Sequence, residues 1–568
     1  MAGGLLQLAA KGQENQYLNG NPSIYFFKDV YMRHSNFVMN SISVNSNYSE
    51  NLSNNDITTI KIRVPRNGDL INNIFLKLNI PDIYSEYKED AGFKFIEKLG
   101  STIIKSVKFL IEDTVIEDLT GEFIHMFQNL YNKSNKVDII NSLSGDDEKL
   151  YHPVGNIDNT YRGYNSDITS TGNFLNKNYN NLPTIKGQNL YIPLPFWFTR
   201  NNGQAFPLLA LSYHNVYIEL KLRPIKELFL LLKKEDIVLE TPIDENGNNI
   251  TINDGNLISR LYYQKPSDSQ DINNFLNSSE WVLDCRLDIN YIFLDNQERN
   301  ILVKEDNKYL IEQVKNITAF EITGRKNIEL DIYHPVKEIF VVPRRNDVEL
   351  RNQWTNFTNL DYTEQNYKDY QTYYLELSFN DALNNVNGIN NPIQQLGKFR
   401  KNSQGVITDI KYGDKFIEGE KLYTNDDIER LLKIWELRPS INIPSINRQN
   451  YKYFNENIIE HLSINFNNQE RQEQKSHKFY DKKQYFIHHN NYNVNGVSIY
   501  SFSLEPEIFQ PTGMCNFSSL NNVAFDIKLK EPSVYDSLSY KYDIMFFFIN
   551  YNILHINHGE GSLVYGNN

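Results

Sequence analysis

A chain of 568 residues is longer than one hydrophobic core supports, because domains usually hold about 100–200 residues. Its net charge of −13 argues against a primary nucleic-acid binder, which needs a basic face to displace phosphate counterions. This length fits two large domains with long insertions or three ordinary ones. With 37 Tyr and 33 Phe, both strand-favouring residues, the composition indicates a mostly β protein.

The first part of the chain opens with an arm, residues 1–22, that has a short apolar patch, and its Gly3, Gly4 and Gly12 are unfavourable to a helix. A first β-domain is expected over 23–225. Alternating apolar and polar residues predict its strands at 24–31, 60–64, 74–80, 107–112, 189–198 and 208–222. Thr120 is predicted to cap a helix whose apolar residues recur at helical spacing: Phe123, Met126, Phe127 and Leu130. The polar residues 132–188 are expected to form a long surface loop.

A linker or insertion is expected at 226–279, followed by a second β-domain over 280–568. The pattern predicts a strand at 282–294, directly after Trp281, a helix at about 296–314 and a strand at 336–342. A large insertion over 344–492 interrupts the alternation, and a helix inside it is predicted to begin after Thr424. Further strands are expected at 497–504, 520–529 and 542–556.

One stretch occurs twice. Residues 215–222 read Asn-Val-Tyr-Ile-Glu-Leu-Lys-Leu, and residues 522–529 read Asn-Val-Ala-Phe-Asp-Ile-Lys-Leu, an offset of 522 − 215 = 307. Each copy alternates four apolar residues with polar ones and follows a segment that carries a proline, Pro195 or Pro506. Any two half-buried strands resemble each other in their alternation. The proline-bearing segment that precedes both copies nevertheless favours one β-domain built twice.

No group of residues indicates catalysis, and the sequence predicts no catalytic, cofactor-binding or metal-binding residue. His488 and His489 are adjacent, so on a strand they would point to opposite faces. His555 and His558 end a strand without an acidic partner at a suitable spacing. The glycines at 559, 561 and 566 resemble a phosphate loop, but no helix can follow them. The carboxylates at 146–147 lie in a polar loop and are predicted to be solvated.

The two cysteines, Cys285 and Cys515, cannot build a disulfide framework and indicate a reducing compartment. Cys285 shares a predicted strand face with apolar residues, which favours a small core residue over a nucleophile. We expect no secretory signal, because a charged region followed by a long apolar core is lacking. The longest apolar runs are far below the ~20 residues that span a bilayer.

Several motifs in sequence order resemble the major capsid proteins of the nucleocytoplasmic large DNA viruses. The opening carries Gly-Gly-Leu-Leu-Gln-Leu at 3–8, a Leu-x-Gly-Asn-Pro turn at 18–22 and Phe-Phe-Lys-Asp-Val-Tyr-Met-Arg-His-Ser-Asn-Phe at 26–37. Pro-Phe-Trp-Phe at 195–198, Tyr-Ile-Phe-Leu-Asp at 291–295 and His-Pro-Val-Lys-Glu at 334–338 continue the resemblance. Cys-Asn-Phe-Ser at 515–518 and Asn-Tyr-Asn-Ile-Leu at 550–554 complete it. The segments 132–188, 226–279 and 344–492 depart from the family pattern.

The resemblance implies an all-β fold of two consecutive eight-stranded antiparallel jelly rolls with short helices and long loop insertions. It also implies a structural function without enzymatic activity or cofactor: three chains would form a pseudo-hexameric capsomer that tiles an icosahedral shell. The implied partners are neighbouring capsomers, minor capsid and penton proteins, and an internal viral membrane near the N-terminal arm, with no direct nucleic-acid contact. The implied location is the virion, after synthesis in the host cytoplasm.

Two other functions share parts of these features. A poxvirus-like scaffold uses the same double jelly roll to build a transient lattice on membranes. A cupin-type metal enzyme uses a single jelly roll, and its metal-binding histidines would have to converge. The N-terminal motifs favour the shell protein over the scaffold, and a metal assay on the purified protein would separate the enzyme.

Overall fold

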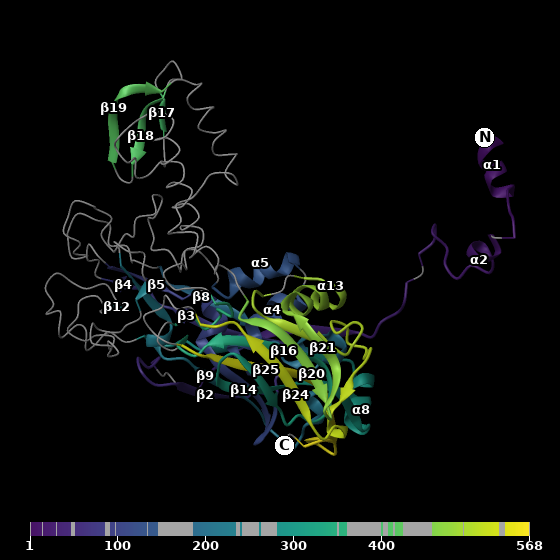
Figure 1. The fold of residues 1–568 in the computed structure, drawn as a ribbon. Helices are drawn as coiled ribbons and strands as arrows, with labels where there is room; N and C mark the ends of the chain where they lie inside the picture. The colour runs from purple at the N-terminus through teal and green to yellow at the C-terminus, as the bar shows by residue number, and fades with distance from the viewer. Residues whose placement is uncertain are drawn as a thin grey trace.

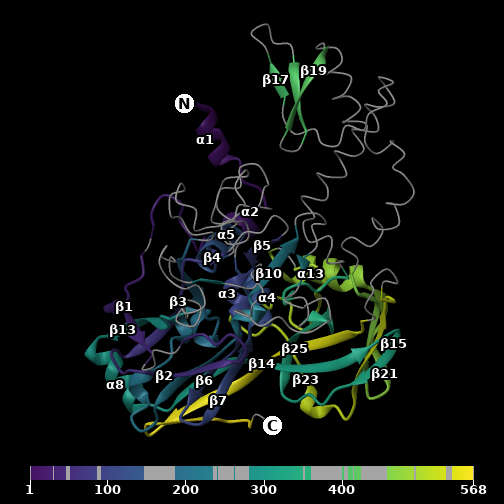
Figure 2. The same cartoon turned by 90° about the vertical axis from the view of Figure 1, so that its left-hand side faces the viewer.

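The computed structural model describes residues 2–13, 15–29, 31–46, 51–85, 91–96, 98–132, 134–145, 186–233, 239–240, 261–262, 281–348, 352–359, 399–401, 407–412, 415–423, 457–491, 494–532 and 540–566. Two β-sandwiches lie side by side, each built from two antiparallel sheets (Figures 1 and 2). The expected all-β class with two jelly rolls is confirmed.

Eight strands between residues 37 and 294 form the first sandwich. One of its sheets has the order β1 (Phe37–Asn45), β13 (Arg286–Leu294), β3 (Leu70–Ile80), β8 (Gln188–Pro193). The facing sheet has the order β2 (Thr58–Val64), β9 (Val216–Leu222), β6 (Ile104–Ile111), β7 (Thr114–Thr120). Numbered along the chain, these orders are 1-8-3-6 and 2-7-4-5, the arrangement of a jelly roll.

The second sandwich repeats this arrangement strand for strand. Its first sheet has the order β14 (Asn307–Ile322), β25 (Tyr542–Asn557), β16 (Pro335–Arg345), β22 (Ser498–Ser501), and β23 (Cys515–Asn516) and β26 (Glu560–Leu563) are attached to it. Its second sheet has the order β15 (Arg325–Glu329), β24 (Val523–Leu529), β20 (Ile459–Phe466), β21 (Gln469–Ser476). The repeated stretch is therefore explained, because β9 and β24 are the seventh strand of their jelly rolls.

Shorter elements decorate the sandwiches. The helices are α1 (Ala2–Ala9), α2 (Asn15–Asn19), α3 (Leu99–Ile103), α4 (Gly121–Tyr131), α5 (Ser134–Leu143), α8 (Asn296–Lys304) and α13 (Gln484–His488), the last continuing a π-helical turn, Phe479–Lys483. Small sheets are formed by β4 (Tyr84–Ser85) with β12 (Leu261–Tyr262), by β5 (Ala91–Phe95), β10 (Phe229–Lys233) and β11 (Leu239–Glu240), and by β17 (Phe399–Lys401), β18 (Ile407–Tyr412) and β19 (Lys415–Tyr423). Among the described helices, none combines the length and apolar character needed to cross a bilayer.

The division between the two jelly rolls differs from the prediction. The strand expected to begin the second domain, β13, instead lies between β1 and β3 and closes the first sandwich. The last strand of a jelly roll pairs with its first and third strands, so local sequence cannot assign it. The second jelly roll therefore starts after β13.

The predicted insertion 344–492 is also shorter at its C-terminal end. Strands β20 and β21 lie within it, yet they pair with β24 in the second sandwich. The edge strand β21 reads Gln-Glu-Arg-Gln-Glu-Gln-Lys-Ser, which has no apolar alternation to reveal it. The helix predicted after Thr424 lies outside the described residues.

Four local expectations were wrong. Residues 24–29 and 31 form no strand and are exposed, because the arm meets no partner strand there; β1 begins only at Phe37. The arm also contains helix α1 despite its glycines, and it extends away from the sandwiches (Figure 1). The helix expected at 296–314 ends at Lys304, and β14 occupies the rest. The predicted loop 132–188 begins with α5, and residues 146–185 lie outside the described residues.

Candidate functional site at the junction of the two jelly rolls

The junction has an apolar centre built from one sheet of the second jelly roll and helix α4 of the first. Strand β25 is buried on both faces over Tyr542–Tyr551, as its Met-Phe-Phe-Phe-Ile run requires. Alternate residues point into the second sandwich, and the others face the first jelly roll. The Phe123 ring of α4 lies 5.7 Å from the Phe547 ring of β25 and 6.4 Å from the Phe340 ring of β16. The hydrophobic core of the first jelly roll therefore continues onto the outer face of this sheet of the second.

Helix α4 is positioned by its N-terminus. The Thr120 hydroxyl accepts a hydrogen bond from the Phe123 backbone N–H at 3.3 Å, which confirms the predicted cap. A Cβ on Gly121 would lie 2.2 Å from the Ile104 carbonyl oxygen, so only glycine allows this close approach. The helix is consequently held tightly between its own sandwich and the second one.

A buried cluster of four charges lies beside this apolar centre. Arg200 places Nη2 3.0 Å from Glu117 Oε1 and Nη1 2.7 Å from Glu312 Oε2, and its guanidinium covers the Phe127 ring at 4.5 Å. Lys337 Nζ donates to Glu312 and, at 2.8 Å, to the Pro506 carbonyl. Two cations thus balance two carboxylates, as burial of charge requires.

The pKa values in this cluster follow from burial and pairing. Burial opposes ionisation of Glu312, but Lys337 and Arg200 outweigh it and hold the pKa of this carboxyl below its usual value. Burial dominates at Glu117 and raises its pKa to about 7, although Arg200 and the Trp197 backbone N–H act in the other direction. The cluster therefore binds one jelly roll to the other electrostatically at neutral pH.

A second buried group joins α4, β16 and the residues that follow α13. His489 Nε2 lies 2.6 Å from Glu338 Oε1, and its Nδ1 lies 3.2 Å from Glu507 Oε1. The Tyr131 hydroxyl donates to the other Glu338 oxygen at 2.6 Å. Burial alone lowers the pKa of His489, but Glu338 and Glu507 overcome this and raise it to about 9. The imidazolium is therefore charged at neutral pH.

A third group of buried charges surrounds Glu122, in the first turn of α4. Glu122 accepts from Arg223 at 2.9 Å and from Arg344 at 3.0 Å, and Arg223 also pairs with Glu227 at 3.1 Å. The Arg223 guanidinium lies 3.5 Å from the centre of the Trp354 ring. Because Arg344 belongs to β16, this group also crosses from one jelly roll to the other.

The hairpin formed by β25 and β26 also contacts the first jelly roll. The Tyr213 backbone N–H donates to the Gly559 carbonyl at 3.0 Å, and the Gly561 N–H donates to His214 Nδ1 at 3.1 Å. A Cβ on Gly561 would lie 2.9 Å from Leu211 Cδ2. Of the three glycines that resembled a phosphate loop in sequence, Gly559 and Gly561 therefore allow close packing of this hairpin on the first jelly roll.

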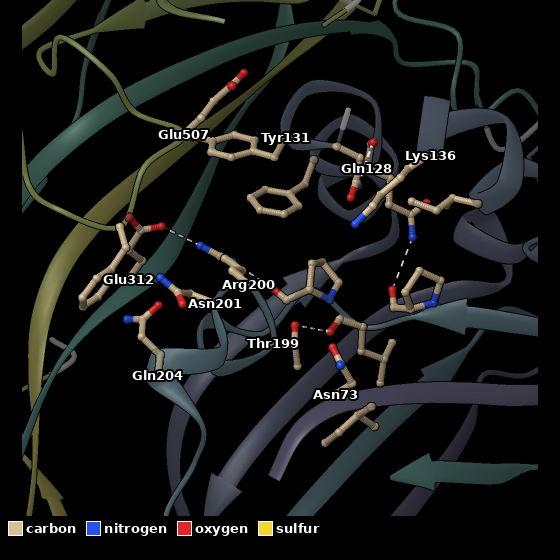
Figure 3. A pocket seen from close by; sticks show the side chains of 18 of the residues that line it. Asn73, Gln128, Tyr131, Lys136, Thr199, Arg200, Asn201, Gln204, Glu312 and Glu507 are labelled. Atoms are coloured by element: carbon tan, nitrogen blue, oxygen red, sulfur yellow. Dashed lines mark hydrogen bonds and ion pairs between the residues drawn. The ribbon is translucent and has the colours of Figure 1, made fainter. Parts of the chain in front are cut away.

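An open cavity of about 420 Å³ lies at the junction and is lined by both jelly rolls (Figure 3). Arg200, Glu312 and Gln204 form one side of it in this view, and Gln128, Lys136 and Tyr131 form the other. Two of its charged groups, Arg200 and Glu312, are already paired with each other across the junction. The cavity is a gap beside the buried charge cluster.

The histidines and cysteines weighed as sites do not converge. His488 Nδ1 lies 3.1 Å from the Leu504 carbonyl, whereas the neighbouring His489 faces Glu338 and Glu507. His555 pairs with Asp306 at 3.4 Å, and His558 sits in the hairpin turn with φ 52°. Within the described part of the chain, no three His, Cys, Asp or Glu side chains are arranged to hold a metal ion.

Cys285 lies in the first core, and burial raises its pKa to about 12, as fits a core residue. Cys515 is half-buried and forms no disulfide with it.

Sequence reasoning did not identify the charged residues of the junction. Glu117, Glu338 and Arg200 read as ordinary strand or loop charges. One signal was present: Lys337 and Glu338 interrupt a strongly apolar strand, Pro-Val-Lys-Glu-Ile-Phe-Val-Val. A charge inside a strand buried on both faces requires a partner from elsewhere in the fold.

Comparisons with known proteins agree with this architecture. A family model described as "Major capsid protein N-terminus" matches residues 25–295, and one described as "Large eukaryotic DNA virus major capsid protein" matches residues 298–562. The chain is 28% identical over 589 residues to a major capsid protein of Phaeocystis pouchetii virus. It is 26% identical over 660 residues to capsid protein 1 of Acanthamoeba polyphaga mimivirus. In both pairs 100% of each chain is covered.

Solved structures share the fold. The Faustovirus major capsid protein superposes with a TM-score of 0.57 at 13% identity, covering 96% of this chain and 94% of that one. A chain of the PBCV-1 virus capsid superposes with a TM-score of 0.55 at 18% identity, covering 96% and 100%. The two family matches meet where β13 ends and the second jelly roll begins. The chain therefore belongs to the major capsid proteins, the structural proteins of the capsids of large eukaryotic DNA viruses.

Proposed function

We propose that three copies of this chain assemble into a pseudo-hexameric capsomer, and that these capsomers tile the icosahedral shell of a large DNA virus. The observation that carries this proposal is the identical strand order of the two jelly rolls. Three chains would present six similar modules, so a three-fold assembly would fill a hexagonal lattice position.

The buried junction supports the same function. Three charge clusters and a shared apolar centre fix the angle between the jelly rolls within one chain. A shell needs such a fixed angle, because a flexible pair of modules would pay conformational entropy at every contact it formed. In this function the chain is a building block, with no catalytic residue and no cofactor.

The proposed partners are neighbouring capsomers, minor capsid and penton proteins, and the internal membrane of the virion, without direct nucleic-acid contact. The arm, residues 1–22, and the segment that follows it support an internal docking role. Leu18, Phe26 and Phe27 are almost fully exposed along this extended segment. Exposed apolar side chains on an arm are typical of binding segments. We further propose that the chain is synthesised in the host cytoplasm and becomes part of the virion.

Two measurements test the proposal. Mass photometry of the purified full chain at micromolar concentration should report a trimer, and only monomers or dimers would contradict it. Deletion of residues 1–20 should leave a folded trimer with an unchanged melting temperature but reduce its incorporation into particles. Normal incorporation of the truncated chain would remove the docking role of the arm, and loss of trimers would assign the arm to the capsomer itself.

A further inference from the structure

The segment that follows the arm has the sequence of a strand but no partner strand in its own chain. Residues 24–31 read Ile-Tyr-Phe-Phe-Lys-Asp-Val-Tyr, which is rich in strand-favouring aromatic and β-branched residues. In the structure residues 24–29 form no strand, and the chain turns at Phe26 and Phe27. Both phenylalanine side chains are almost fully exposed. The segment therefore holds apolar surface in water that pairing with a sheet edge would bury.

Strand β1 offers an open sheet edge of matching length. It is the terminal strand of its sheet, and among the described residues its only strand pairing is with β13. Phe37 and Val38, at the start of its nine residues, are 49% and 61% exposed. A long edge strand with exposed apolar residues is a template for an added strand.

The side chains of β1 form two rows, and one row faces the first hydrophobic core. Ile42 and Val44 pack against this core, and Val38 belongs to the same row because side chains on a strand alternate. Their row continues in β13 with Leu287 and Ile289, which are fully buried. An added strand with apolar residues in this row would extend the core past the present edge of the sheet.

Residues 24–31 match this row in an antiparallel register. One polar pair and two apolar pairs then share the core-facing row: Lys28 with Asn40, Phe26 with Ile42, and Ile24 with Val44. Cross-strand pairs of this kind are the unit of sheet stabilisation. A shift by one residue would instead turn Asp29 toward the core. The sequence of the segment thus fits β1 in one orientation and one register.

A second copy of the chain, rather than the same chain, fits as the source of the edge. Residues 31–36 contain neither glycine nor proline and form no turn, so the chain does not reverse onto its own β1. The arm leads away from the sandwiches of its own chain (Figure 1). Each chain therefore has one strand to give and one edge to receive a strand, as in domain swapping.

We propose that residues 24–31 of one chain add as an antiparallel strand to the free edge of β1 in a second copy of this chain. This inference rests on the proposed assembly of several copies and names the partner of the segment that follows the arm. Residues 1–22 remain available to the inner partners of the shell. The contact joins a tail to a sheet edge, so it is separate from any contact between sandwiches.

Disulfide cross-linking in the full chain tests the register. Lys28→Cys and Asn40→Cys are introduced together, with Cys515→Ser to remove the half-buried native thiol. Both positions are exposed in the single chain, so the reduced protein should melt like the wild type. After oxidation, denaturing gels without reductant should show covalent dimers and larger species. The reason is that opposite residues on one face of an antiparallel pair lie within reach of a disulfide.

The matched control moves one cysteine by a single residue. Lys28→Cys is combined with Ser41→Cys, an equally exposed position whose side chain belongs to the other row of β1. This pair should remain mostly monomeric under the same oxidation.

Two neighbouring phenylalanines separate strand addition from unspecific apolar contact. Phe26→Ser removes the side chain that would face the core, whereas Phe27→Ser removes one that would face the other side. Introduced beside Lys28→Cys and Asn40→Cys, Phe26→Ser should slow cross-linking by about tenfold or more, because burial of a phenylalanine side chain is worth at least that factor in binding. Phe27→Ser should have a much smaller effect.

The inference is overturned if the two cysteine pairs cross-link equally, if neither does, or if the two phenylalanine substitutions have equal effects. A disulfide between Lys28→Cys and Asn40→Cys that closes within one chain would also overturn it, because the arm would then cover its own β1. Mass photometry of the wild type tests the proposed function separately. A trimer without register-specific cross-links leaves the proposed capsomer intact, whereas specific cross-links without a trimer would contradict the capsomer and support the arm contact.

Discussion

Replacement of Glu312 by Gln is the sharpest perturbation of the junction. The side chain of Glu312 is 14% exposed and pairs with Arg200 and Lys337, whose side chains are 13% and 2% exposed. The substitution keeps the shape but removes the charge that balances both cations. Arg200 would retain Glu117, whereas Lys337 would retain the Pro506 carbonyl and the Tyr131 ring but no carboxylate. Lys337 would therefore remain buried without a counter-charge.

The loss of the Glu312 charge sets the expected destabilisation of the Glu312→Gln variant. Removing one partner of a buried ion pair costs about 3–5 kcal/mol, because the remaining charge is buried without compensation. An unfolding entropy of about 2.1 cal/mol/K per residue over the whole chain gives roughly 1 °C per kcal/mol, so the melting temperature should fall by roughly 3–5 °C. The control is Glu321→Gln, which breaks the solvent-exposed pair of Glu321 with Lys541 and should leave the melting temperature unchanged.

The assay is thermal melting of wild type and variants at equal protein concentration, repeated across pH. The pairing holds the pKa of Glu312 below its usual value near 4.5, so its stabilisation is present above pH 4.5 and is lost as pH falls through the lowered pKa. The difference between wild type and Glu312→Gln should therefore shrink in acid. A drop below 1 °C at neutral pH, or a difference independent of pH, would refute the role of this cluster.

The remaining predictions concern other parts of the chain. The pKa of His489 is raised from 6.5 to about 9, so its stabilisation is complete below pH 6.5 and lost as pH rises through 9; His489→Gln should flatten the melting temperature over that interval. Gly561→Val should lower the melting temperature, because its side chain would collide with Leu211, whereas Gly203→Ala, whose Cβ would meet only Asn201 Oδ1 at 3.5 Å, should not; equal melting curves would disprove the close packing of β26 on the first jelly roll. Chelator and reductant should each leave the melting temperature unchanged, and a large loss with either would reveal a metal site or disulfide.

Much of the architecture was present in local patterns. Alternation predicted core strands such as 60–64 and 74–80, because half-buried strands must present one apolar face. Thr120 predicted its helix start, because a hydroxyl cap depends only on residues within one turn. The repeated stretch identified equivalent strands of the two jelly rolls.

Partners distant in sequence decided the rest. The sequence alone determined that this is a β protein with two similar modules and the motifs of a capsid family, because periodicity and motifs are local properties. Only the tertiary structure decided that β13 closes the first jelly roll and that β21, a wholly polar strand, belongs to the second. Only it showed that Glu312 and Glu338 are buried partners across the junction, because the burial of a charge depends on neighbours hundreds of residues away.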